Sequence, residues 1–308
     1  EIHKIFLKEE DDMATQLCFQ APSIKMEKLD NLWFQLSSIA CNLKCKHCYL
    51  SCSPNNKKKN FLPLDEVKNA LEIVKNQSLK GIYLTGGEPL LHPDFNNIVR
   101  LCLKKTNVTI LSNGILINDK KARFLRQIES DHDNELIFRI SLDHYTEEKN
   151  DEIRGKGSFK KALNGIANLV RYDFNPIISI VNIWNEDENH LKQKFAELMA
   201  QIDFEVEDVN FKIVPLIKLG EYSKLNEEYT ESEIVQQSDM DEAKVELFDC
   251  ASSRVVTCNG VYSCPLLVGD PRGKVGNILT DSSNKVYLET NVCYTCRQHN
   301  NRMFCNNW

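Results

Sequence analysis

The sequence predicts an α/β fold, a partial (β/α)6 TIM barrel with a small cysteine-rich C-terminal extension. Between residues 31 and 220, short apolar runs alternate with segments of helical spacing, and the short connections between them favour a parallel sheet. Six of the 12 cysteines follow residue 249, where this alternation has ended. We therefore expect three parts: an N-terminal capping segment (1–30), the barrel (31–220), and a linker with a cysteine-rich domain (221–308).

Composition and charge argue against two classes of protein. The 308 residues are 42% hydrophobic and 27% charged, which is ordinary for a globular protein, and no apolar run is long enough to cross a bilayer. The net charge of -6 argues against a general nucleic-acid binder, which would usually be basic. The cysteines cluster at short spacings, which favours metal ligation over disulfides. Since metal thiolates favour a reducing compartment, we expect a cytoplasmic protein.

The expected elements follow one another in chain order. Two short apolar runs within residues 1–30 predict a hairpin that caps the barrel. Buried strands are then expected at Leu32–Leu36, Gly81–Thr85, Val108–Ser112, Leu136–Leu142, Ile177–Ile183 and Val209–Val214. Helices are expected at Asp65–Gln77, Asp94–Lys104, Asp119–Ser130, Ser158–Tyr172 and Glu186–Gln201, with Asp94, Asp119 and Ser158 as N-caps. In barrels of this kind the functional residues gather at the C-terminal ends of the strands.

A cysteine-rich loop directly follows the first predicted strand. Cys41, Cys45 and Cys48 have the spacing C-x3-C-x2-C. Thiolates are preferred ligands of iron–sulfur clusters, so three of them on one loop can hold three corners of a 4Fe-4S cubane. Cys52 is the next cysteine, and if it is not a ligand, one iron stays open for a small molecule. A zinc site or a set of buried thiols is the alternative interpretation.

This loop resembles that of the radical S-adenosylmethionine (SAM) enzymes, in which an aromatic residue, here Tyr49, follows the third cysteine. The resemblance implies the same partial barrel and a 4Fe-4S cluster whose open iron binds the amino and carboxylate groups of SAM. It also implies that one electron from the cluster cleaves SAM to methionine and a 5′-deoxyadenosyl radical, which abstracts hydrogen from a substrate. An external electron donor such as a flavodoxin or a ferredoxin is then expected as a partner.

Residues at the ends of the next strands resemble the SAM-binding motifs of this family. Paired glycines let the backbone approach a ligand closely and a carboxylate can bind an ammonium group, so Gly86, Gly87 and Glu88 match the motif that contacts the SAM amino group. The resemblance implies further SAM contacts at Ser112, Asn113, Ser141, Asp143, Arg154 and either Ile180 or Val181. Arg154 is assigned to the SAM carboxylate because the planar guanidinium binds a carboxylate through two hydrogen bonds. One such motif alone would more often be a solvated turn.

The late cysteines predict a second metal site. Asn259-Gly260 marks a hairpin turn whose returning strand would carry Cys264. A structural zinc ribbon is one interpretation of the cysteines in this region. They also resemble the SPASM and twitch extensions of radical SAM enzymes, which hold auxiliary 4Fe-4S clusters, although the hairpin spacing before Cys264 is one residue shorter here. We expect one auxiliary cluster, held by four of Cys250, Cys264, Cys293, Cys296 and Cys305.

Two residues close to these sites keep open roles. Cys258 is left over from the second set of cysteines and is a hydrogen-atom donor in catalysis, a ligand or an inert buried thiol. His47 lies inside the cysteine loop, where we expect it to face solvent or to lie behind the metal ligands.

The sequence therefore predicts a radical SAM enzyme whose substrate binds between barrel and extension. The resemblance implies a ribosomally made peptide as substrate, modified by a crosslink, a thioether, epimerisation or oxidation. One alternative is the biosynthesis of a small-molecule cofactor or metabolite by the same radical chemistry. An alternative of another class is a two-cluster electron-transfer protein without SAM chemistry. Neither nucleic acid nor membrane is expected as a partner.

Overall fold

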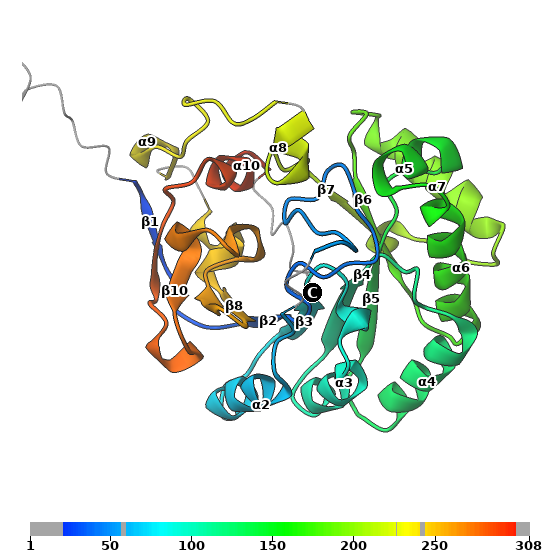
Figure 1. The fold of residues 1–308 in the computed structure, drawn as a ribbon, viewed down its shortest axis with the longest axis horizontal. Coiled ribbons are helices and arrows are strands. Elements are labelled where there is room, and N and C mark those ends of the chain that lie inside the picture. Colours follow the sequence, from blue (N-terminus) through cyan, green and yellow to red (C-terminus); the bar gives the residue numbers. More distant parts are fainter. Residues whose placement is uncertain (1–20, 57–59, 226, 241–243, 300–308) are drawn as a thin grey trace, which may run out of the picture.

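The computed structural model describes residues 21–56, 60–225, 227–240 and 244–299. Within these ranges, parallel strands that pair in chain order form a curved sheet, and helices cover its outer face (Figure 1). The strands are β2 (Asn31–Gln35), β3 (Gly81–Thr85), β4 (Val108–Ser112), β5 (Leu136–Ser141), β6 (Ile177–Val181) and β7 (Phe211–Val214). This is the partial (β/α)6 TIM barrel that the sequence predicted.

Strands β2 and β3 are buried because other side chains cover both of their faces. Every residue of β2 and of β3 is buried, as expected for parallel strands inside an α/β fold. Leu32 and Phe34 belong to the main core, which includes the apolar faces of the helices. Between them, Trp33 points to the opposite face and stacks on Tyr83, with ring centroids 4.2 Å apart. The two-residue period of the strand therefore separates an outer core from the inside of the barrel.

Helices connect the successive strands. They are α2 (Leu64–Ile73), α3 (Phe95–Leu103), α4 (Asp119–Ser130), α5 (Glu147–Arg154), α6 (Ser158–Arg171) and α7 (Glu188–Ala200). Asn118, not Asp119, caps α4, because its side chain accepts a hydrogen bond from the backbone N–H of Lys121 (2.9 Å). Ser158 is likewise the first residue of α6, and its hydroxyl donates to Asp151 of the preceding helix (3.0 Å).

The sequence pattern does not predict helix α5. Seven of its eight residues, in Glu-Glu-Lys-Asn-Asp-Glu-Ile-Arg, are polar or charged, so no apolar stripe marks it. The helix nevertheless buries one side, on which Asn150, Ile153 and Arg154 lie. Polar packing rather than an apolar face therefore fixes this element, and it brings Arg154 to the end of the barrel.

The extension continues the barrel sheet. β8 (Ser253–Thr257) pairs in parallel with the free edge of β2, β9 (Gly260–Tyr262) returns antiparallel to β8, and β10 (Lys274–Gly276) pairs with β9. The order of the sheet in the described residues is β10-β9-β8-β2-β3-β4-β5-β6-β7. The predicted hairpin is confirmed, since Thr257 pairs with Gly260. Strand β9 ends at Tyr262, however, so Cys264 lies beyond the strand that was expected to carry it.

The two ends of the described chain meet in a second small sheet. β1 (Ser23–Lys25) pairs antiparallel with β11 (Lys285–Tyr287). Most of the hairpin predicted within residues 1–30 lies outside the described residues. The helices of this half are α8 (Glu221–Leu225), α9 (Gln237–Met240) and α10 (Asn291–His299). A second apolar core unites Ile24 of β1 with Ile217, Phe248 and Val292, so the described N-terminal strand packs with the extension.

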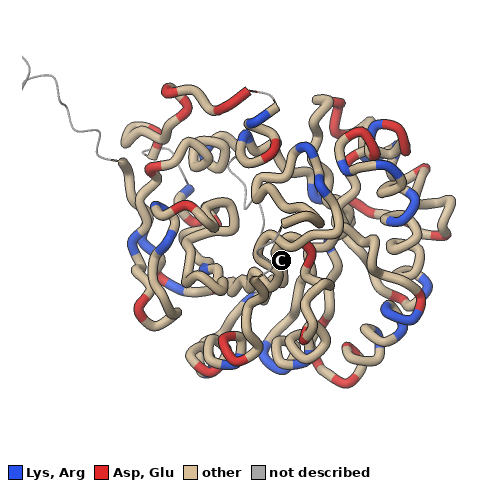
Figure 2. The backbone as a smooth tube through the Cα atoms, viewed as in Figure 1, with Lys and Arg blue, Asp and Glu red and all other residues tan. Residues whose placement is uncertain are grey.

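Charged side chains of both signs are mixed along the outer helices (Figure 2). Among the described residues, none of the helices has the combination of length and apolar character that a bilayer span requires.

Candidate functional site

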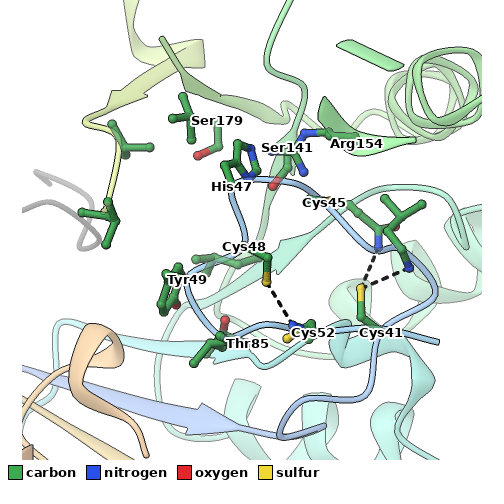
Figure 3. Close-up of a pocket in the computed structure, with 18 of the residues that line it drawn as sticks. Cys41, Cys45, His47, Cys48, Tyr49, Cys52, Thr85, Ser141, Arg154 and Ser179 are labelled. Atoms are coloured by element: carbon green, nitrogen blue, oxygen red, sulfur yellow. Dashed lines mark hydrogen bonds between the residues drawn. The ribbon is translucent and has the colours of Figure 1, made fainter. Parts of the chain in front are cut away.

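The three cysteines of the C-x3-C-x2-C loop line one pocket at the C-terminal end of the barrel strands (Figure 3). The loop follows β2 and contains a tight turn in which the N–H of Cys48 donates to the carbonyl of Cys45 (3.2 Å). The N–H of Lys46 donates to the carbonyl of Ile153 at 2.9 Å, which ties the loop to α5. Cys41, at the start of the loop, is buried. The barrel therefore presents three thiols to a single cavity.

Two of the sulfur atoms accept hydrogen bonds from nitrogen. The Sγ of Cys41 lies 3.4 Å from the backbone N–H of Leu43 and 3.8 Å from the side-chain amide of Asn113, and both donate to it. The Sγ of Cys48 accepts from the backbone N–H of Cys52 (3.3 Å). Such donors stabilise a thiolate and are the surroundings that a metal-bound sulfur needs.

The thiols of the loop differ in acidity. Burial raises the pKa of Cys41 to about 11 and that of Cys45 to about 12. The pKa of Cys48 is lowered, mainly because the thiol of Cys52 donates a hydrogen bond to its sulfur. Cys52 is itself buried and lines the same pocket, and the pKa of its thiol is raised by the same hydrogen bond. The pocket thus contains a fourth thiol, directly beside Cys48.

Glycines at the end of β3 let the backbone pack against the cysteine loop. A Cβ atom at Gly87 would lie 2.2 Å from the carbonyl oxygen of Ala40, and one at Gly86 would lie 2.4 Å from Oγ of Ser37. Both distances are far below van der Waals contact, so only glycine fits at these positions. Gly86 and Gly87 also line the pocket, as the sequence predicted.

Glu88 does not line the pocket and is turned toward the end of β4. Its side chain is fully buried and accepts hydrogen bonds from the hydroxyl of Ser112 (2.9 Å) and the N–H groups of Asn113 (2.9 Å) and Leu90 (3.1 Å). Burial raises its pKa to about 7, against the effect of these hydrogen bonds. The expected contact with an ammonium group therefore does not follow from its position, because the carboxylate is occupied in holding the turn after β4.

Asp143, at the end of β5, joins the opposite side of the pocket to the cysteine loop. The Oδ1 atom accepts from Nη2 of Arg154 (2.8 Å) and from the N–H of Val181 (3.1 Å). The Oδ2 atom lies 2.7 Å from Nε2 of His47 and 2.6 Å from Nε of Arg154. His47 therefore faces this carboxylate instead of solvent. Asp143 itself does not line the pocket, whereas His47, Arg154 and Val181 do.

The charges of this group outweigh the cost of burying a carboxylate. Burial by itself would raise the pKa of Asp143, but the Arg154 guanidinium and the His47 ring lower it well below its usual range. The fork of Arg154, which the sequence assigned to the carboxylate of SAM, is bound to Asp143. We call His47, Asp143 and Arg154 the clamp.

Most other predicted contacts lie on the pocket, namely Tyr49, Ser112, Asn113, Ser141 and Val181. Ile180 is fully buried in the main core, so Val181 is the one of the pair on the pocket. Sequence analysis missed Thr85, Arg139 and Ser179, which also line the pocket. Each is a polar residue within a buried strand, and that contrast is a signal that could have identified them. Arg139 precedes Ser141 by two residues and therefore shares its face of β5.

A second, apolar pocket lies in the extension. It is lined by Cys250, Cys264, Cys293 and Cys296, together with Asp249, Ser263 and six apolar side chains. Cys250 comes from the turn that precedes β8, Cys264 from the turn after β9, and the other two from α10. The structure thus unites four of the five cysteines that the sequence grouped together. The fifth, Cys305, lies outside the described residues.

In the second pocket Cys250 and Cys293 are buried, whereas Cys264 and Cys296 are half-buried. Burial raises the pKa of Cys264 to about 12 and raises that of Cys250 and Cys296 well above the usual range. The Sγ of Cys293 forms a hydrogen bond with the hydroxyl of Thr290 (3.1 Å). In the part of the chain that the structure describes, no group of three or more His, Cys, Asp or Glu side chains is arranged to hold a single metal ion.

A comparison with protein families identifies the chain. The model described as "Radical SAM superfamily" matches residues 37–197, the segment that contains the cysteine loop, the glycine pair and the clamp. The chain belongs to the radical SAM superfamily. Enzymes of this family use a 4Fe-4S cluster together with SAM, so the resemblance of the cysteine loop is confirmed at the level of the family.

The chain is similar to several curated proteins and solved structures. The antilisterial bacteriocin subtilosin biosynthesis protein AlbA of Bacillus subtilis is 33% identical over 128 residues, which are 41% of this chain and 27% of AlbA. Mycofactocin maturase MftC of Mycobacterium ulcerans is 27% identical over 271 residues, covering 79% of this chain and 70% of MftC. Streptococcus suis SuiB bound to its precursor peptide SuiA has a TM-score of 0.60 at 14% identity, covering 82% of this chain and 63% of SuiB. The chain thus spans 27% of AlbA and less than two thirds of SuiB.

Both pockets have residues that fit the cofactors of a radical SAM protein. The first offers three thiols on one loop, a backbone wall of two glycines, and a buried arginine. The second offers four thiols and the hydroxyl of Ser263, which is buried and has no hydrogen-bond partner among the described residues. Thiolates are the preferred ligands of iron–sulfur clusters, and an unpartnered buried donor beside them suits a sulfur acceptor.

The position of Cys258 argues against the role of hydrogen-atom donor. It lies in the turn between β8 and β9 and lines neither cysteine pocket. Its neighbours, which include Phe61 and Ile278, line a separate surface hollow. Cys258 lies away from both cysteine pockets because a residue at the tip of a two-residue hairpin projects away from the sheet.

Proposed function

We propose that this radical SAM protein cleaves SAM reductively and abstracts hydrogen from a substrate during the maturation of a ribosomally made peptide. The observation that carries the proposal is the single pocket in which Cys41, Cys45 and Cys48 meet the ends of strands β3 to β6. When bound, the cluster supplies the electron that splits SAM into methionine and a 5′-deoxyadenosyl radical. The residues described below bind, orient and enclose these groups.

In this proposal the three loop cysteines hold three irons and leave the fourth for SAM. Gly86 and Gly87 form the wall nearest to the cysteine loop. Because they have no side chains, this wall can pack closely against the loop. A guanidinium has five N–H donors, so the pairing of Arg154 with Asp143 leaves donors for the carboxylate of SAM. Glu88 acts behind this surface, because it holds the turn that carries Ser112 and Asn113.

The substrate site that we propose is a groove between the barrel and the extension. Tyr49 lines both this groove and the first pocket. Leu266, Leu267 and Val292 line both the groove and the second pocket. The groove therefore borders on both cysteine pockets, and a bound chain would lie within reach of each. The wall next to Tyr49 contains Gly220, where a Cβ atom would lie 2.4 Å from the carbonyl oxygen of Cys48.

A peptide substrate is supported by the relatives. AlbA and MftC are named for bacteriocin biosynthesis and for maturation, and SuiB was solved with a precursor peptide. We propose the same substrate class for this chain, with modification by a crosslink, a thioether, epimerisation or oxidation. A peptide also suits a groove lined by both polar and apolar side chains, among them Tyr229, Leu219 and Asn291.

Further parts of the proposal concern the surroundings of the enzyme. We propose a flavodoxin or a ferredoxin as the external electron donor, because the cluster must be reduced before each cleavage of SAM. We place the protein in the cytoplasm, since free thiols and metal thiolates require reducing conditions. We also propose residues 31–220 as the catalytic barrel, 221–308 as the linker and auxiliary-cluster domain, and 1–30 as a capping segment. The auxiliary 4Fe-4S cluster is assigned to Cys250, Cys264, Cys293 and Cys296.

The proposal is tested by anaerobic reconstitution with iron and sulfide, followed by SAM and dithionite. We expect 5′-deoxyadenosine from the parent chain and none from Cys41→Ala. Cys258→Ala is the matched control, since it also removes a cysteine but from outside both pockets, and we expect it to keep the activity of the parent. A folded, cluster-loaded parent that forms no 5′-deoxyadenosine would contradict the proposal and would favour an electron-transfer protein. The substrate class is tested with a short peptide encoded beside this chain, whose mass should change in the same reaction.

A further inference from the structure

Arg254 is a buried cation without an acidic partner in the described residues. Its side chain is fully buried within β8. The guanidinium donates to backbone carbonyls of Cys250 (3.0 Å), Ser253 (2.7 Å) and Ser283 (2.8 Å), and its Nε atom has no partner among the described residues. Carbonyl dipoles solvate this charge but do not cancel it. A buried charge without a counter-ion is strongly destabilising, so a nearby anion is expected.

The nearest candidates for that anion are the sulfurs of the second pocket. Arg254 is hydrogen-bonded to the backbone of Cys250, and Cys250 and Cys264 both line the pocket, so thiolates at these positions would act on its charge. Asp249 also borders the pocket but is not paired with Arg254. Four thiolates that hold an iron–sulfur cluster carry net negative charge. Loading of the pocket would therefore supply the counter-charge for Arg254.

Ser263 gives a second, independent indication of an acceptor in the same pocket. The residue lines the cavity and is completely buried, with a relative accessibility of 0%. The hydroxyl has no hydrogen-bond partner among the described residues. A buried hydroxyl left without a hydrogen-bond partner is destabilising. A sulfur acceptor in the pocket would satisfy this hydroxyl. The hydroxyl of Thr290 already forms such a hydrogen bond with the sulfur of Cys293.

We propose that Arg254 and Ser263 tune the four-cysteine pocket for a redox-active iron–sulfur cluster by stabilising its reduced, more negative state. This inference rests on the auxiliary cluster of the proposed function. The pocket gains one electron from the external donor, or from dithionite in the test, and no covalent bond forms or breaks. The charge of Arg254 and the hydrogen bond from Ser263 both favour the added electron, so both raise the reduction potential of the group that is held there.

The experiment uses the full chain with Cys41, Cys45 and Cys48 replaced by alanine, so that only the second pocket can be loaded. After anaerobic reconstitution, iron and sulfide are counted and the midpoint potential is measured by a redox titration followed by electron paramagnetic resonance. We expect Arg254→Met to weaken reduction at least tenfold, which is about 59 mV for one electron. We expect Arg254→Lys to keep most of the parent potential, because it keeps the charge. Ser263→Ala should shift the equilibrium in the same direction by about threefold.

Two controls separate this role from a structural one. Ser282→Ala removes a hydroxyl that donates to the carbonyl of Leu279, away from the pocket, and should leave the potential unchanged. Ser263→Ala removes a single oxygen and keeps the test valid if Arg254→Met does not fold. If Ser263→Ala and a folded Arg254→Met both keep the midpoint potential of the starting chain with the second pocket loaded, this inference alone is overturned. Failure of the second pocket to take up iron and sulfide in the starting chain would overturn the auxiliary cluster as well.

Discussion

The two cysteine pockets of this chain are built in opposite ways. The first lies at the strand ends of the barrel, where polar and charged side chains share its lining with apolar ones and a carboxylate behind its wall holds the clamp together. The second is lined mainly by apolar side chains, with one guanidinium behind Cys250. The first pocket combines three closely spaced cysteines of one loop with the backbone of two glycines after β3, whereas the second collects four thiols from three separate segments.

This difference indicates how each pocket can be used. A site that must bind and release a polar ligand needs polar donors and an open coordination position, and the proposed function gives the first pocket both. A site that only stores or passes electrons is better closed, because exclusion of water and fixed dipoles then control its potential. Substitutions in and around each pocket test this division.

The largest effect is expected from Asp143→Asn. Removing the charge of a buried, hydrogen-bonded carboxylate leaves the Arg154 guanidinium uncompensated and should cost about 3–5 kcal/mol of unfolding free energy, measured by urea denaturation at pH 7. The first pocket should also lose iron, since His47 in the cysteine loop loses its partner. The exposed Asp119→Asn, which breaks a surface pair with Arg171, is the matched control and should show no comparable loss.

The pH dependence of stability gives an independent check on the clamp. The pKa of Asp143 in the folded protein is below its unfolded value of 3.8, so the native state binds fewer protons. Its contribution is therefore complete above about pH 4 and is lost as the pH falls through the folded pKa. We expect Asp143→Asn to have a shallower loss of stability in acid than the parent chain. Equal acid sensitivity of the two proteins would mean that the clamp is not an ion pair in solution.

The sequence predicted the barrel well because its signals are local. Each apolar run, cap and short connection that defines the barrel lies within a few residues, and even the strand-end motifs are contiguous. The pairing of β8 with β2 joins residues more than 200 positions apart, and no local pattern encodes it. Helix α5 was missed because its buried side is polar, formed partly by Asn150 and Arg154.

Side-chain direction was the main limit for the site. The motif identified Glu88 and Arg154, but not that Glu88 turns to the end of β4 or that Arg154 binds Asp143. Those partners come from other strands, so they depend on tertiary structure. The sequence grouped the late cysteines because few cysteines follow the barrel, and four of them line one pocket in the structure. The same reasoning could not place Cys258, whose direction is fixed by the hairpin turn.

The smallest effect is expected from Cys52→Ser. Cys52 lies beside Cys48 in the first pocket, but the proposed function leaves one iron open and gives this fourth thiol no iron to bind. We expect the variant to keep its iron content and to form 5′-deoxyadenosine within about twofold of the parent, since serine keeps a hydroxyl donor toward the sulfur of Cys48. Cys48→Ser is the matched variant and should lose the first cluster. Loss of iron in both variants would make Cys52 a ligand.

The central claim, an open first cluster and a closed second one, is tested most directly by electron paramagnetic resonance of the reduced protein with and without SAM. Two variants are compared, one with Cys41, Cys45 and Cys48 replaced by alanine and one with Cys250 and Cys264 replaced. We predict that SAM changes the spectrum of the variant that keeps the barrel cysteines and leaves the spectrum of the other unchanged. A change with SAM in the variant that keeps only the extension cysteines would contradict the account. So would an unchanged spectrum in the variant that keeps the barrel cysteines.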